Sequence, residues 1–205
     1  MSTVRTSAFD ASLTRPSWAP DGSRFAVEMA WKGYFVDKDG TTATPFGPPD
    51  THVTNPAFSL DGDQIAFGGF NAPEGQQVPT WRLFLADANG DNAKAISPDT
   101  GWLPNWSPDG RTLLFVNAAA DGSYAQWVIN RDDTDEKRVS LGKADFHAAW
   151  SPDGNQVAYD TLYGVYRINL TNPDGTGTQQ VTPCGRRTVL ASPSRPTRRG
   201  ATTST

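Results

Sequence analysis

The chain lacks the features that mark disulfide-stabilised, membrane-spanning and secreted proteins. Its 205 residues contain one cysteine, Cys184, which excludes an internal disulfide. No apolar run approaches the ~20 residues that a membrane-spanning helix needs. The N-terminal segment also has no apolar core of the kind found in signal peptides. We therefore expect no membrane span and, for the chain as encoded, a cytoplasmic location.

Positive charge and catalytic motifs are also scarce. The chain has 18 Lys and Arg against 22 Asp and Glu, a formal net charge of −4. A surface that binds nucleic-acid phosphates needs clustered cations, so we expect no nucleic-acid partner. No Gly-x-Ser-x-Gly nucleophile motif occurs, and the glycines at 175–177 open no helix that could hold a phosphate. The sequence therefore predicts no catalytic residue and no cofactor.

Helical periodicity is missing as well, and turn-forming residues are abundant. We find no long stretch with apolar residues at helical spacing. The 19 Gly and 16 Pro, together with seven Trp, are typical of an all-β protein with many turns. The length suits a single domain with a hydrophobic core.

A six-residue motif, x-aromatic-x-Pro-Asp-Gly, occurs four times, with leucine in place of proline in the second copy. In the third copy, Pro108 favours the first corner of a type I turn and Gly110 takes the left-handed position that follows. The repeated Asp residues are 40, 48 and 44 positions apart, and a short apolar strand follows each copy. Repeats of about 40–45 residues with strands alone are typical of β-propeller blades. The four copies are Ser17–Gly22, Ala57–Gly62, Asn105–Gly110 and Ala149–Gly154.

The phrase Trp-Ser-Pro-Asp-Gly with the strand after it resembles the WD40-like repeat called PD40. This repeat occurs in TolB-type propellers and in the propeller domains of prolyl-oligopeptidase-like and tricorn-like proteases. The resemblance covers about residues 15–182 and departs from the pattern at Leu60 and Ala19. It implies a propeller fold far more strongly than an activity, because many functions occur on propellers. TolB-type relatives are usually periplasmic, which would apply here if a longer parent has lost its leader.

We predict an all-β propeller of four recognisable four-stranded blades, part of a six-bladed TolB-like ring. Trp18, Phe58, Trp106 and Trp150 should be buried between blades. A blade needs neighbours on both faces, so the chain closes as a tight four-bladed ring, pairs with another copy, or is a fragment of a longer propeller. We favour the fragment. The predicted parts are an edge segment at 1–14, blades at about 15–50, 51–98, 99–141 and 142–183, and a basic disordered tail at 184–205.

The two histidines, His52 and His147, should both lie just before an innermost strand, with Asp50 and Asp145 nearby. PD40-type lyases hold a metal with propeller histidines, so the resemblance admits a metal site. Two histidines are too few for a typical zinc site, however, and they belong to different blades. We therefore expect loop histidines and no metal.

Two classes of function remain. The first is a non-catalytic binding module that takes a protein or peptide partner on its loop face, as the TolB-like resemblance implies. The second is the propeller part of an enzyme, either the gating domain of a peptidase or a metal-dependent lyase. Trp31 and Trp102 should lie in connecting loops outside the repeat, where they serve either as contact anchors or in local packing. Self-association through open blade edges is a further expectation. The candidate contact residues are Trp31, Asp50, His52, Phe70, Glu74, Asp99, Trp102, Tyr124, Asp145, His147 and Tyr163.

Overall fold

A computed structural model describes residues 15–71, 80–97, 100–118, 121–140, 142, 144–161 and 167–181. Within these ranges the chain forms four antiparallel four-stranded sheets. The first holds β1 (Ser17–Trp18), β2 (Arg24–Met29), β3 (Lys32–Asp37) and β4 (Ala43–Phe46). The second holds β5 (His52–Phe58), β6 (Gln64–Asn71), β7 (Thr80–Asp87) and β8 (Lys94–Ala95). The third holds β9 (Trp102–Trp106), β10 (Thr112–Ala118), β11 (Tyr124–Asn130) and β12 (Lys137–Arg138). The fourth holds β13 (Asp145–Trp150), β14 (Val157–Thr161), β15 (Arg167–Thr171) and β16 (Gln179–Val181).

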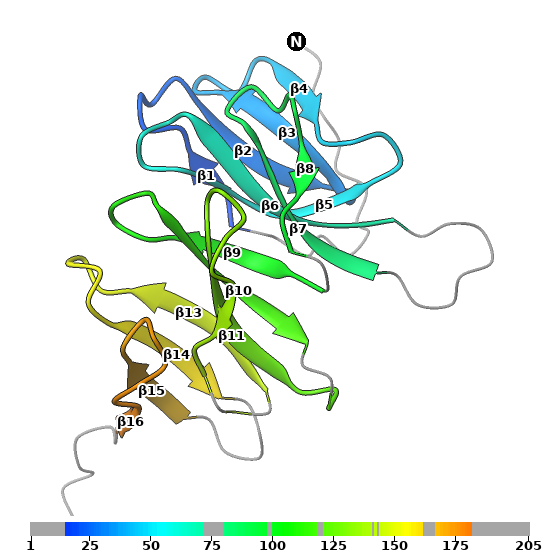
Figure 1. Ribbon diagram of the computed structural model, residues 1–205. Helices are drawn as coiled ribbons and strands as arrows, with labels where there is room; N and C mark the ends of the chain where they lie inside the picture. Colours follow the sequence, from blue (N-terminus) through cyan, green and yellow to red (C-terminus); the bar gives the residue numbers. More distant parts are fainter. Residues whose placement is uncertain are drawn as a thin grey trace, which may run out of the picture.

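The order of the strands within each sheet follows the chain, so every sheet is a simple meander. Figure 1 shows the sheets one after another along an arc, with the first and the fourth at opposite ends. This confirms the prediction of an all-β chain built from four four-stranded units. No helix in the described part is long and apolar enough to cross a membrane. The predicted edge segment and basic tail lie outside the described residues.

The Pro-Asp-Gly turns have the predicted geometry. In the third sheet the Gly110 amide donates to the Ser107 carbonyl at 2.9 Å, and Gly110 has a φ of 69°. The Ser107 hydroxyl donates to Asp109 at 2.6 Å and accepts the Thr112 amide at 3.0 Å. The same serine and aspartate contacts recur at the turns after β5 and β13. One local arrangement therefore closes the first hairpin of these three sheets.

Apolar side chains between neighbouring sheets form the core. Successive residues of a strand point to opposite faces, so each middle strand contributes side chains to the junctions on both faces of its sheet. In β10, Leu113 and Phe115 pack toward the second sheet, while Leu114 packs toward the fourth. All three side chains are fully buried. The sheets are thus held face to face, as propeller blades require.

A tryptophan hydrogen bond recurs at two of these junctions. The Trp106 indole donates to the Ala57 carbonyl of the second sheet at 3.0 Å, and the Trp150 indole donates to the Asn105 carbonyl of the third at 3.2 Å. Trp106 is 7% exposed, as predicted for a residue between blades. The same prediction is wrong for Trp18, which is 55% exposed. Trp18 begins the first sheet, and no described sheet precedes it.

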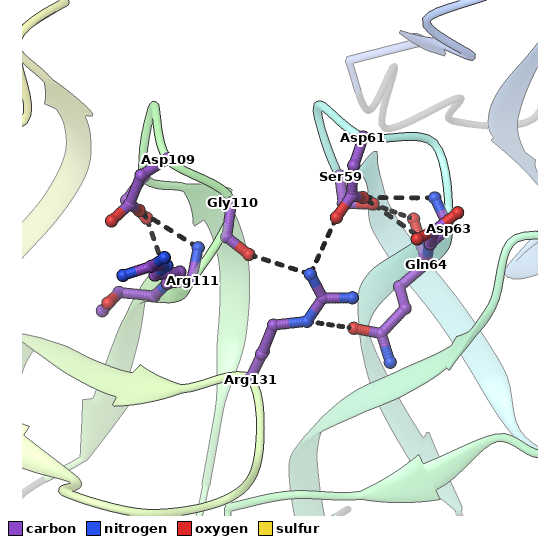
Figure 2. Close-up of polar contacts among 10 residues, drawn as sticks. Ser59, Asp61, Asp63, Gln64, Asp109, Gly110, Arg111 and Arg131 are labelled. Carbon is purple, nitrogen blue, oxygen red and sulfur yellow. Dashed lines mark hydrogen bonds and ion pairs between the residues drawn. The ribbon is translucent and has the colours of Figure 1, made fainter.

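Arg131 ties the second and third sheets together at the end of the Pro-Asp-Gly turns (Figure 2). Its guanidinium donates to the Asp61 carboxylate at 2.8 Å and to the Gln64 side chain at 2.9 Å. Hydrogen bonds from Ser59 and then from Arg131 lower the pKa of Asp61 from 3.8 to about 2. The Asp61 carboxylate therefore contributes to stability only while it is ionised.

This lowered pKa predicts a specific pH dependence. The contribution of Asp61 is fully present above its ordinary pKa of 3.8 and is lost as the pH falls toward about 2. We expect the Asp61→Asn variant to lose less stability than the parent across that window, because it has no carboxylate to protonate. Thermal melts at a series of pH values measure this, with Leu60→Ala in the same turn as the control. Parallel curves for the parent and Asp61→Asn would contradict it.

Candidate functional site

A continuous row of aromatic rings runs along the end of the sheets opposite the Pro-Asp-Gly turns. The row crosses all four sheets. Its rings lie at or next to the start of the first or third strand of a sheet, except for one ring near the end of a second strand. We call this row the aromatic ladder. Its members are Trp31, His52, Phe70, Trp81, Trp102, Tyr124 and Phe146.

The ladder crosses every junction between the sheets by a direct ring contact. At each crossing, a ring at the start of the third strand of one sheet meets a ring of the next sheet. The centroid distances are 5.7 Å for Trp31–Phe70, 5.9 Å for Trp81–Trp102 and 5.5 Å for Tyr124–Phe146. These distances lie in the range in which aromatic pairs attract each other.

Between these crossings, contacts between rings of the same sheet connect the row. In the second sheet His52 stacks on Phe70 at 4.5 Å, and Phe70 contacts Trp81 at 4.3 Å. In the third sheet Trp102 meets Tyr124 edge to face at 5.3 Å. The row therefore has no break between the first sheet and the fourth.

Three rings of the ladder occupy the same repeat position. The strand pairing places Trp31, Trp81 and Tyr124 directly before the third strand or at its start, each next to the loop that follows the second strand. Tyr166 has the matching place in the sequence of the fourth unit and lies outside the described residues. The ladder is thus partly a property of the repeat.

The ladder is accessible to solvent along its length. Trp31 is 41% exposed and Tyr124 is 39% exposed, and the other five rings are half-buried. A cleft of about 580 Å³ opens beside Trp31 and His52. Its other walls include Phe46, Pro48 and Asp50. The exposed rings of the ladder therefore continue into a cleft at its first-sheet end, where Trp31 and His52 belong to both.

The predicted contact residues separate into two groups. Trp31, His52, Phe70 and Trp102 come together in the ladder, and Tyr124 joins them. Asp50 lies in the adjoining cleft, exposed and with a φ of 58°. Trp102 is the first residue of β9, so its predicted place in a connecting loop is wrong.

Asp145 and His147 have different surroundings. Asp145 is fully buried, and its carboxylate accepts the Thr161 hydroxyl at 2.6 Å. His52 is the first residue of β5 and His147 lies within β13, so the prediction that both precede an innermost strand is wrong. The Nδ1 atom of His147 contacts the Asp160 carboxylate at 2.9 Å. His147 also lines a groove of about 720 Å³ along the innermost strands. The predicted residues Glu74, Asp99 and Tyr163 lie outside the described residues.

The described residues contain no group of three or more His, Cys, Asp or Glu side chains that could hold a metal ion. The surroundings of the two histidines differ, since His52 stacks on a phenylalanine and His147 pairs with an aspartate. Tyr159 does not offer a base, because burial and then the nearby Asp145 carboxylate raise the pKa of its hydroxyl to about 12.

The sequence interpretation missed two ladder rings, Trp81 and Phe146. Neither residue was among the candidate contact residues. Alignment of the third strands by their buried residues would have placed Trp81 at the position of Trp31 and Tyr124. Phe146 matches Trp102 four residues before the repeat tryptophan.

Comparisons with known proteins match this architecture. No family model matches the chain. An uncharacterized protein of Agrobacterium fabrum is 25% identical over 171 residues, which cover 72% of this chain and 54% of that protein. TolB of the Tol-Pal system of Alcanivorax borkumensis is 33% identical over 81 residues, covering 38% and 19%. An uncharacterized peptidase of Bacillus subtilis is 26% identical over 213 residues, covering 80% and 30%. The chain therefore spans at most 54% of the length of these relatives.

Solved structures show the fold. TolB from Acinetobacter baumannii superposes with a TM-score of 0.65 at 19% identity, over 83% of this chain and 43% of that chain. An oligogalacturonate lyase in complex with manganese gives 0.64 at 18% identity, over 82% and 52%. A puromycin hydrolase gives 0.63 at 15% identity, over 77% and 28%. The chain has the fold of the TolB-like β-propellers, and at these identities the likeness extends to the fold alone.

Proposed function

We propose that the chain is a non-catalytic binding module that takes a protein or peptide partner on the aromatic ladder. The observation that carries this proposal is the unbroken row of solvent-accessible rings across four sheets. Aromatic side chains bury large areas at low cost in conformational entropy, and tryptophan and tyrosine are enriched among the residues that dominate binding energy.

The cleft at the first-sheet end favours an extended peptide as the partner. Its lining combines the rings of Trp31 and His52 with Pro48 and Pro49. Extended peptides bind along aromatic-lined grooves, with side chains placed between the rings. The ladder offers such a track, because its exposed rings Trp31 and Tyr124 stand at separate points along the row.

The experiment uses peptides selected from a displayed random library against the parent chain. The best peptide is titrated calorimetrically against the parent and against the Trp31→Ala, Tyr124→Ala double variant. We expect at least tenfold weaker binding, because two exposed anchors are removed while the buried core is untouched. Leu60→Ala, an exposed apolar residue at the opposite end of the sheets, is the matched control. Unchanged affinity in the double variant, or failure to select any peptide, would contradict the proposal.

The second candidate is the propeller part of an enzyme, which the names of the neighbouring lyase and hydrolases favour. On that alternative the ladder would select substrate for reacting groups placed elsewhere. Metal analysis of the purified chain and an assay for oligogalacturonate cleavage distinguish the lyase alternative from the binding module. Stoichiometric metal together with cleavage would favour the enzyme.

A further inference from the structure

Each junction between neighbouring sheets joins two different faces. In the third sheet, Leu113 and Phe115 pack toward the second sheet, and Leu114 and Val128 pack toward the fourth. We call the first of these the backward face of a sheet and the second its forward face. All three internal junctions pair the forward face of one sheet with the backward face of the next, because each core cluster combines residues of two successive sheets.

The fourth sheet has a forward face that no described sheet covers. The strand pairing places Ile168 and Val181 at the positions that Gln126 and Val139 occupy in the third sheet. Gln126 and Val139 are buried beneath the fourth sheet, whereas Ile168 is 48% exposed and Val181 is 37% exposed. The repeat positions are the same, so the difference in exposure follows from the fact that no sheet of the described part lies on this face.

The first sheet has the complementary surface, an uncovered backward face. Trp18 pairs with Phe25 as Trp106 pairs with Leu113 in the third sheet. The rings of Trp18 and Phe25 contact each other at 5.2 Å, and Trp18 is open to solvent while Trp106 is buried. The two ends of the arc therefore present the two unmatched halves of a junction that the chain itself forms three times (Figure 1).

The tryptophan hydrogen bond gives this junction a polar anchor. At both described occurrences the indole donates to the carbonyl of the residue just before the matching aromatic in the preceding sheet. Trp18 supplies the indole at the first-sheet end. The residue just before Trp150 is Ala149, so its carbonyl is the matching acceptor at the fourth-sheet end.

We propose that the forward face of the fourth sheet binds the backward face of the first sheet of a second copy of this chain. The Trp18 indole of one copy then donates to the Ala149 carbonyl of the other, and Ile168 and Val181 are covered. The contact continues an established interface of the same chemistry, which is the reason for choosing a second copy as the occupant. Because the two faces differ, the contact is heterologous and builds either a closed ring or an open filament.

The test uses the full chain and two single variants, one for each face. Sedimentation velocity from low to high micromolar concentration should show concentration-dependent association of the parent. Trp18→Arg and Ile168→Glu should each be monomeric alone, because each lacks one functional face. An equimolar mixture of the two variants should form a 1:1 dimer that grows no further, because one intact face of each kind remains. Trp31→Arg, which alters an exposed tryptophan on the ladder, should associate like the parent.

Three outcomes would overturn the proposal: a parent that stays monomeric throughout, variants that still self-associate, or a mixture that stays monomeric. Circular dichroism and melting temperature establish that each variant is folded, which both exposed positions permit. A monomeric parent would mean that no second copy covers these faces. Association that requires Trp31 instead would place the contact on the ladder.

Discussion

Replacing Trp106 with alanine is expected to lower the free energy of unfolding by about 3–5 kcal/mol. The indole is buried between the second and third sheets, packs in their shared core cluster and donates to the Ala57 carbonyl. Truncation leaves a cavity at the junction and an acceptor without its donor, and these losses add. Chemical denaturation followed by circular dichroism measures the change.

Trp18→Ala is the matched control for this substitution. It removes the same side chain from the same repeat position, but at an exposed site. At a protein concentration low enough to keep the chain monomeric, we expect a change within about 0.5 kcal/mol. Equal losses for the two variants would show that the covering sheet does not determine the contribution of the tryptophan.

Replacing Gln126 with leucine is expected to lower the free energy of unfolding by about 2–4 kcal/mol. The Gln126 side chain is fully buried, and its amide donates to the main-chain carbonyls of Asp145 and Phe146 in β13. Leucine matches the shape closely and occupies the corresponding position in the second sheet, as Leu83. The cost therefore comes from two acceptors left without a donor, each about 1–3 kcal/mol.

Gln156→Leu serves as the control, because it is the same substitution at an exposed position of the neighbouring sheet. Its effect should stay within about 0.5 kcal/mol. Denaturant titrations of the two variants and the parent provide the comparison. If Gln126→Leu is as stable as the parent, the bridge between β11 and β13 contributes no net stability.

The sequence predicted the sheets well because their determinants are local. Pro108, Asp109 and Gly110 specify a turn by their own backbone preferences, and the apolar residues that follow specify a strand. Burial between sheets was harder to predict, since it depends on which neighbour is present. Trp18 and Trp106 are alike in sequence context, yet one is exposed and the other buried.

The candidate site was predicted in part. Trp31, His52, Phe70 and Trp102 were among the candidate contact residues, and the structure places these four rings in one row. The row that connects them needs Trp81, whose role depends on its contact with Trp102 across a junction. Such a contact joins residues that no short sequence pattern relates. Whether the row binds a partner stays a prediction.

The ladder has a mechanical consequence, because neighbouring rings such as Trp81 and Trp102 belong to different sheets. A ligand bound to both rings would contact two sheets at once, so its binding would stabilise the junction between those sheets against separation. Heat or force that separates the sheets would also break the ring contacts of the aromatic ladder. The affinity of such a ligand and the free energy of unfolding would then be coupled, because a ligand that binds only the folded state stabilises it.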